Sequence, residues 1–116
     1  MQVGREVYSL KFFDAKLIKY EMLPGLGLAA TEKAGPSTKR MWPSLASYHD
    51  KYLFVTGGMG LVSVEYYDIS MDKWEQGPDL NIPRQSHSSC ALGDKLYVCC
   101  GSDYAEPLRS IERLDV

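Results

Sequence analysis

Residues 53–74 of this chain, LFVTGGMGLVSVEYYDISMDKW, contain the pattern from which most of the sequence is built. An apolar run that ends at Thr56 leads to a glycine pair, Gly57 and Gly58, and then to an alternating run. A continuous apolar run predicts a strand with both faces buried, whereas alternation predicts one buried face. We therefore expect a sheet that lies between two other layers.

Parts of this stretch recur towards the C-terminus. LYVCCG at 96–101 overlays LFVTGG at 53–58 with a shift of 43 residues, and SIERLD at 110–115 overlays SVEYYD at 63–68 with a shift of 47. The shift grows by four residues between the two matches, which places an insertion in the loop 102–109. Insertions between strands mark loops that lie outside the repeated core.

The N-terminal segment contains a third, less similar copy. FFDAKLIKYEMLP at 12–24 overlays YYDISMDKWEQGP at 66–78 with a shift of 54 residues. This match predicts a turn at Asp14 between two strands, 7–13 and 19–23. The alternative is one amphipathic helix over 6–24, because that segment contains few helix breakers.

Residues 25–41 mix Gly, Ala, Pro, Ser and Thr with little periodicity, so we predict a loop or linker. A connection of this length in a compact domain is usually functional or disordered. From Trp42 onward the sequence is strand-like, with turns where Asp and Gly gather. The predicted strands are 42–48, 52–56, 61–67, 73–76, 83–91, 96–100 and 110–116.

A period of 43 to 54 residues, with four short strands in each unit, is typical of a β-propeller blade. The glycine pair followed by Tyr67-Asp68 and Trp74 resembles a kelch repeat. Pro83-Arg84-x-x-His87, with LYV before Gly101, is similar to the same pattern. Three positions depart from it: Cys100 replaces the first glycine of the pair, Tyr20 the tryptophan and Leu114 the tyrosine.

Five residues are predicted to have structural roles within these repeats. Tyr67 and Trp74 are large apolar side chains with one polar group each, suited to filling the space between neighbouring sheets. Gly57, Gly58 and Gly101 permit positive φ and a close approach of backbone that a side chain would prevent.

The predicted fold class is all-β, an incomplete β-propeller of kelch-like four-stranded antiparallel blades, one full and two partial. The predicted units are the outer two strands of a partial blade (1–24), the linker (25–41), a complete blade (42–80) and the inner three strands of another (81–116). Propellers close with 4 to 8 blades. The alternatives are a fragment of a longer propeller, a truncated gene product, or copies that share blades head to tail in a ring.

Composition excludes several classes of protein. The net charge is −2, and the mixture of residues is that of a globular domain, with no electrostatic reason to expect nucleic acid or a membrane as a partner. Residues 1–40 hold 7 basic and 4 acidic side chains, and residues 41–116 hold 6 and 11. The N-terminus lacks the apolar core of a secretory signal, so we expect an intracellular, cytoplasmic location.

No catalytic or metal-binding set can be assembled from the sequence. The segment Gly57-Gly58-Met59-Gly60 lacks the Gly-Lys-Ser/Thr ending of a phosphate-binding loop. His49 and His87 have no Cys or His at ligand spacing beside them. Cys90, Cys99 and Cys100 are too few for a disulfide scaffold, and we expect them to be reduced and buried. We predict no cofactor and no metal.

Two classes of function remain. The resemblance to kelch repeats implies a non-catalytic module that binds an unknown protein partner through loops on one face, at 24–41, 57–61, 76–84 and 102–109. The residues expected to be exposed there for contact are Met59, Leu61, Arg84, Tyr104 and Arg109, because interfaces are enriched in aromatic, Met and Arg side chains. The alternative is a propeller enzyme of galactose-oxidase type, a copper oxidase.

Overall fold

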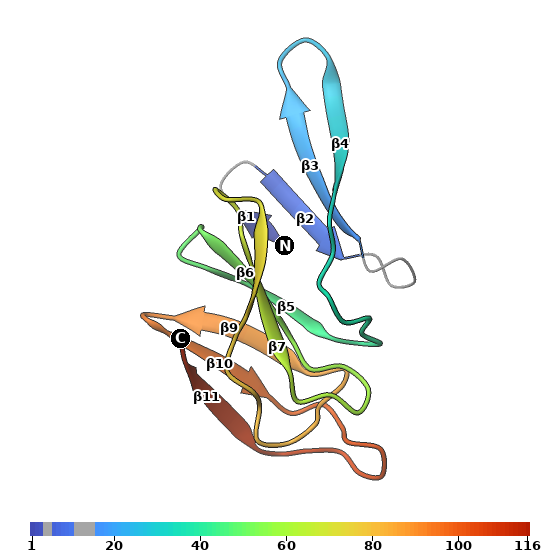
Figure 1. The fold of residues 1–116 in the computed structure, drawn as a ribbon, viewed down its shortest axis with the longest axis vertical. Coiled ribbons are helices and arrows are strands. Elements are labelled where there is room, and N and C mark those ends of the chain that lie inside the picture. Colours follow the sequence, from blue (N-terminus) through green and yellow to red (C-terminus); the bar gives the residue numbers. More distant parts are fainter. Residues whose placement is uncertain (4–5, 11–15) are drawn as a thin grey trace.

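The computed structural model of this protein describes residues 1–3, 6–10 and 16–116, which form three antiparallel β-sheets (Figure 1). The first sheet contains β1 (Gln2–Val3), β2 (Glu6–Leu10), β3 (Leu17–Leu23) and β4 (Gly27–Lys33). The second contains β5 (Ser44–Tyr48), β6 (Tyr52–Thr56), β7 (Val64–Asp68) and β8 (Lys73–Gln76). The third contains β9 (Ser88–Leu92), β10 (Lys95–Cys99) and β11 (Ile111–Asp115).

The all-β fold class is confirmed, with antiparallel sheets of three and four strands as expected for partial kelch-like blades. In each sheet the strands follow one another in chain order, so each sheet is a meander. The third strands begin at Leu17, Val64 and Ile111, and both steps are 47 residues. Three successive units of similar length therefore make up the described chain. The described residues include no helix that is long and apolar enough to span a bilayer.

The N-terminal third differs from the sequence prediction. Residues 27–33, expected to lie in a linker, form β4, which pairs with β3 from Leu17↔Lys33 to Leu23↔Gly27. The Pro24-Gly25 turn closes this hairpin, since Gly25 has φ 75° and the Leu26 amide donates to the Leu23 carbonyl. The first sheet thus holds four strands instead of an outer pair, and the helical alternative for 6–24 is wrong.

The shift of 54 residues explains this error. It aligned Tyr20 with Trp74, but Tyr20 lies in a third strand, β3, and Trp74 in a fourth, β8. In the second sheet, β8 pairs with the third strand, β7, and in the first sheet β4 pairs with the third strand, β3. β4 is therefore the equivalent of β8, and Tyr20 does not stand in for the tryptophan. The predicted turn at Asp14 falls outside the described residues.

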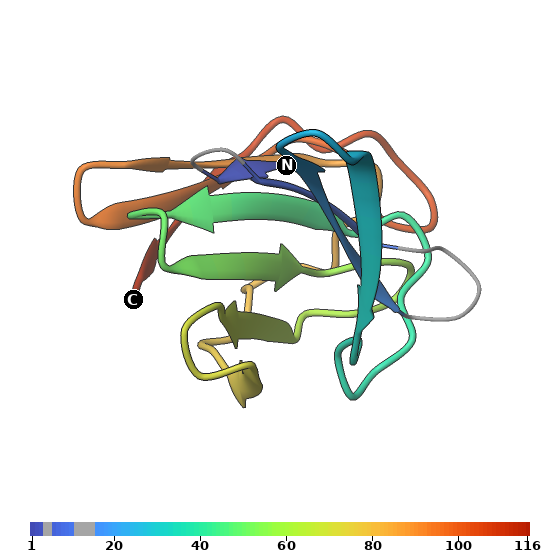
Figure 2. The same cartoon turned by 90° about the horizontal axis from the view of Figure 1, so that it is seen from above.

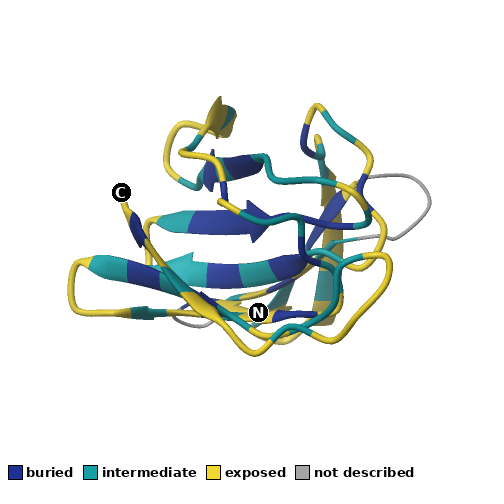
Figure 3. Cartoon of the chain, turned by 90° about the horizontal axis from the view of Figure 1, so that it is seen from below, coloured by how far each residue is buried: buried dark blue, intermediate teal, exposed yellow. Residues whose placement is uncertain are grey.

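The second sheet is buried between the other two, as the apolar run at 52–56 predicted. Alternate residues of β6 point to opposite faces. Leu53 joins a cluster with Tyr8 and Leu17 of the first sheet, and Phe54 joins one with Leu96 and Val98 of the third. Figure 3 shows buried residues concentrated in these central strands and exposed residues in the loops at the periphery.

Two glycines make close contacts at the ends of the second strands of two repeats. A Cβ atom on Gly57 would lie 2.6 Å from the Arg84 carbonyl oxygen, and one on Gly101 would lie 2.5 Å from the Gln85 carbonyl oxygen. Both positions therefore exclude a side chain. Cys100 occupies the place of Gly57 in its repeat and has the same φ of 61°, so the backbone geometry is kept without the glycine.

Tyr67 and Trp74 lie together on the face that contacts the first sheet. Their ring centroids are 5.3 Å apart, Tyr67 is buried, and its hydroxyl donates to Asp72. Trp74 is half-buried, and its indole Nε1 donates to the Ala34 carbonyl at 2.6 Å. Trp74 thus covers the edge of this interface and ties it to the segment after β4.

The prediction that the cysteines are buried is wrong. Cys90 and Cys100 are exposed and Cys99 is half-buried, and none of the three forms a disulfide. Their chain neighbours Ala91 and Val98 face the second sheet. Because adjacent residues of a strand point to opposite faces, Cys90 and Cys99 point away from it.

Replacement of Leu53 by Ala should lower the free energy of unfolding by about 3 kcal/mol, because this side chain is 0% exposed and its loss leaves a cavity. Leu92, which is 71% exposed, is the matched control. Leu92→Ala should change stability by less than about 0.5 kcal/mol. Urea denaturation of both variants measures the difference, and equal midpoints would contradict the layered core.

Candidate binding surface

Two buried arginines form the same set of contacts in successive repeats. Arg40 donates from Nη1 to the Gly57 and Ser63 carbonyls and from Nη2 to Glu65, at 2.7, 2.7 and 3.0 Å. Each arginine therefore joins the segment before the first strand of its sheet to the end of the second strand and to the third.

Arg84 repeats this arrangement in the third sheet. It donates from Nη1 to the Cys100 and Ser110 carbonyls, at 3.0 and 2.8 Å, and from Nε to Glu112 at 2.9 Å. The prediction that Arg84 is exposed for partner contact is wrong, because its side chain is 0% exposed. Its guanidinium group is used instead to hold the bases of the loops.

The carboxylates that meet these arginines are also bound by backbone. The amide of Ser37 donates to Glu65 at 2.8 Å, and the amide of Asn81 donates to Glu112. Burial raises the pKa of Glu65, but the hydrogen bonds from Ser37 and Arg40 outweigh it and leave that pKa below its ordinary value. Glu65 is therefore stabilised in its charged form.

Arg84→Ala should lower the free energy of unfolding by about 3–5 kcal/mol, because Glu112 and two backbone carbonyls would lose their buried partner. Arg109, an exposed arginine in the loop between β10 and β11, is the matched control. Arg109→Ala should cost less than about 0.5 kcal/mol. A loss below 1 kcal/mol for Arg84→Ala in thermal or urea unfolding would contradict the proposed structural role.

Backbone hydrogen bonds connect the loops beyond these arginines to one another. The Met59 amide donates to the Met41 carbonyl at 2.8 Å, and the Ser86 amide donates to the Trp42 carbonyl at 2.9 Å. Gln85 and Ser102 exchange backbone hydrogen bonds of 3.0 Å. Two segments before first strands and two loops after second strands thus form one continuous surface.

Tyr104 adds a contact between the loop after β10 and the loop after β6. A Cβ atom on Gly60 would lie 2.6 Å from the Tyr104 hydroxyl oxygen, so the tyrosine ring lies over this glycine. Tyr104 is nevertheless 75% exposed. In Figure 2 the loops 57–63 and 100–110 project to one side of the molecule, and the hairpin turns at 49–51 and 93–94 to the other.

Four residues of these connected loops form what we call the loop surface: Met41, Trp42 and Tyr104, which are exposed, and Met59, which is half-buried. Of the predicted contact residues, Met59 is half-buried and Tyr104 is exposed. Leu61 is half-buried in a turn in which its amide donates to the Gly58 carbonyl, and Arg109 is exposed at the far end of its loop.

Met41 and Trp42 were missed because they were assigned to a linker and a strand. A signal was present in the sequence, since a shift of 44 residues aligns Met41 with Gln85 and Trp42 with Ser86. Neither large apolar residue is therefore part of the repeated pattern. Trp42 also has a φ of 55°, a conformation that residues other than glycine rarely adopt.

His87 is the buried histidine of the second interface. Its Nε2 lies 2.8 Å from the Thr56 hydroxyl, in a hydrogen bond whose donor depends on the tautomer. Burial, together with the positive charge of Arg84, lowers its pKa from 6.5 to about 4. The described residues contain no cluster of three or more His, Cys, Asp or Glu arranged to bind a metal ion.

The low pKa of His87 predicts a pH dependence of stability. Between pH 6.5 and about 4 the unfolded chain binds a proton at this position and the folded chain does not, so stability falls as the pH falls. The expected loss is on the order of 2 kcal/mol. This loss of stability should be much smaller in His87→Gln, because glutamine stays neutral. It should be unchanged in His49→Gln, because the His49 side chain is exposed. Urea midpoints measured from pH 7 to 4.5 test this.

Residues 83–116 match the family model of the Kelch motif. Kelch-like protein 36 from Bos taurus is 35% identical over 71 residues, which cover 56% of this chain and 11% of that protein. The C-terminal part of the chain therefore contains a kelch repeat. Kelch-like protein 4 from Homo sapiens is 42% identical over 52 residues, 45% of this chain and 7% of that protein. The chain thus spans about a tenth or less of these relatives' length.

Proposed function

We propose that this chain is a non-catalytic protein-interaction module that binds an unknown protein partner through the loop surface. The observation that carries the proposal is the convergence of Met41, Trp42, Met59 and Tyr104 from three loops at one end of the stacked sheets. Met, Trp and Tyr are enriched at protein interfaces, where they supply large contact areas.

The rigid support of these loops favours recognition. Arg40 and Arg84 fix the base of each loop through three or more hydrogen bonds, so the exposed side chains project from a preformed frame. Less conformational entropy is then lost when a partner binds. The similarity to kelch-like proteins supports the same class of function.

Two further expectations belong to the proposal. The three sheets would form part of a larger propeller, completed by further sheets, and the two exposed outer faces are the surfaces where these would pack. A cytoplasmic location agrees with three free cysteines, because thiols stay reduced there. We propose no cofactor and no nucleic-acid or membrane partner.

The test compares partner capture by charge variants at two ends of the molecule. Met41→Asp and Tyr104→Asp place a carboxylate in the loop surface, whereas Met71→Asp and Leu92→Asp place one on exposed apolar residues outside it. Proteins captured from a cell extract by the parent chain should be reduced at least tenfold with the first pair and kept with the second.

Quantitative mass spectrometry gives the readout, and circular dichroism confirms that all four variants are folded. If the same proteins are lost equally from both pairs of variants, binding does not use the loop surface and the proposal fails.

A further inference from the structure

The outermost strands of the first two sheets, β4 and β8, each have an unpaired edge. β4 pairs with β3 and β8 pairs with β7, and no described strand pairs with their other sides. Each is the fourth strand of its sheet and therefore lies at the rim of the stack. Further sheets that pack on the outer faces of the stack would leave these two edges free.

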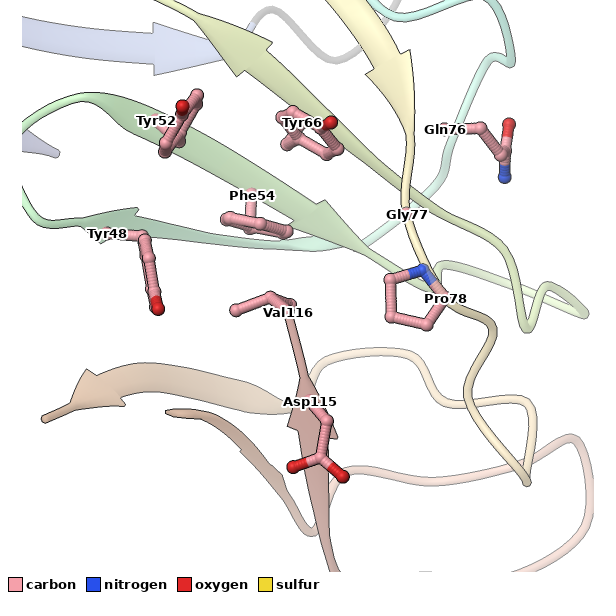
Figure 4. A pocket seen from close by; sticks show the side chains of 9 residues that line it. All are labelled: Tyr48, Tyr52, Phe54, Tyr66, Gln76, Gly77, Pro78, Asp115 and Val116. Carbon is pink, nitrogen blue, oxygen red and sulfur yellow. The ribbon is translucent and has the colours of Figure 1, made fainter. Parts of the chain in front are cut away.

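The unpaired edge of β11 is of a different kind. β11 is a third strand, and the third strand of the second sheet, β7, is covered by β8. Figure 4 shows the cleft beside β11, with Val116 on one side and Tyr52 and Tyr66 on the other. This edge is therefore that of an inner strand of a repeat, and β4 and β8 are the rim strands of the described sheets.

β8 has the features by which proteins protect an exposed edge from other chains. It has four residues, KWEQ, and two of them, Lys73 and Glu75, are charged. Trp74 packs against Tyr67 of its own sheet. A short edge strand with charged side chains is a poor template for the addition of another strand.

β4 lacks this protection. It has seven residues, GLAATEK, of which five are exposed, and the segment 27–31 contains no charge. Leu28 is 67% exposed, and Leu26, in the turn before the strand, is 82% exposed. A long, exposed edge strand with few charges is typical of sheets that pair with another chain.

The β3–β4 hairpin is also longer than its counterpart in the second sheet. A step of 47 residues takes Glu21 to Asp68, the last residue of β7, so β3 continues for two residues past the equivalent point. Figure 1 shows this hairpin projecting from the stack, away from the other two sheets. A neighbouring sheet with a hairpin as short as that of the second sheet would leave the tip exposed.

The charges of β4 indicate that the edge fits a second copy of the same strand. In an antiparallel pair with Ala30 opposite Ala30 of the second copy, all seven residues of each strand face the other strand. Glu32 then lies opposite Leu28, and Lys33 lies opposite Gly27. No like charges meet, whereas a parallel pair in register would set each charge beside its own copy.

We propose that two copies of this chain associate through their β4 strands, which pair antiparallel about a twofold axis at Ala30. The two four-stranded first sheets then form one continuous sheet. An interface of this kind uses the same surface on both copies, so it closes after two copies. No residue of the loop surface lies in β4, so either proposal can fail without the other.

Multi-angle light scattering of the full chain tests the proposal. The parent chain should have twice the 13.0 kDa mass of one copy, and the dimer should dissociate on dilution. Ala30→Lys and Ala30→Asp each set two like charges opposite one another at the axis, so each variant should be monomeric. An equimolar mixture of the two variants should recover the dimer, because opposite charges then face each other.

The control variant places the same charge outside the proposed interface. Met71→Lys lies in the turn between β7 and β8, where the parent side chain is 61% exposed, and this variant should remain dimeric. Circular dichroism of the three variants should show that each is folded.

Four results would overturn the proposal. A parent chain that is monomeric at millimolar concentration would leave the β4 edge to a strand of a different protein. Dimers of both Ala30 variants would place the contact on another surface. A mixture of the variants that stays monomeric would contradict the pairing of Ala30 with its copy. Open-ended assembly of the parent chain would contradict a closed, twofold dimer.

Discussion

The arrangement of this protein depends on the hydrogen bonds and ion pairs of two buried guanidinium groups, those of Arg40 and Arg84. Each arginine satisfies backbone carbonyls at the end of one strand and the start of another, and each is neutralised by a glutamate of the third strand. Without these groups, several buried polar atoms would lack partners at the points where the loops leave the sheets. The same residues that stabilise the fold thus determine where the loop surface can form.

Much of the fold was predictable from the sequence because the repeated pattern is local. The strands at 52–56 and 73–76 agree with β6 and β8, since continuous apolar residues and a single tryptophan mark them plainly. The first sheet was not predictable in the same way. Its strand β4 has the sequence GLAATEK, in which small and polar residues conceal a strand that exists through its pairing with β3.

The candidate site was predicted less well than the fold, for a different reason. Met59 and Tyr104 were found because their residue types are common at interfaces, and Arg84 was misplaced by the same criterion. Residue type alone does not distinguish an arginine that projects into solvent from one that is enclosed. Ser110 and Glu112, which enclose Arg84, stand 26 and 28 residues later in the chain and reach it only in the folded structure. Trp42 was missed because it was assigned to a strand, although a shift of 44 residues aligns it with Ser86 and so sets it outside the repeated pattern.

The contacts across the two interfaces are unequal, and this has a consequence for cooperativity. The second and third sheets are linked by hydrogen bonds between Ser44 and Ser89, Thr56 and His87, Tyr48 and the Asp94 carbonyl, and Gly58 and the Arg84 carbonyl. Among the described residues, the first sheet contacts the second through apolar packing and through the hydrogen bond of Trp74 to the Ala34 carbonyl. Because neighbouring units of a repeat protein are coupled only through such interfaces, the second and third sheets should open together as one unit in native-state hydrogen exchange, while the first opens at a lower free energy.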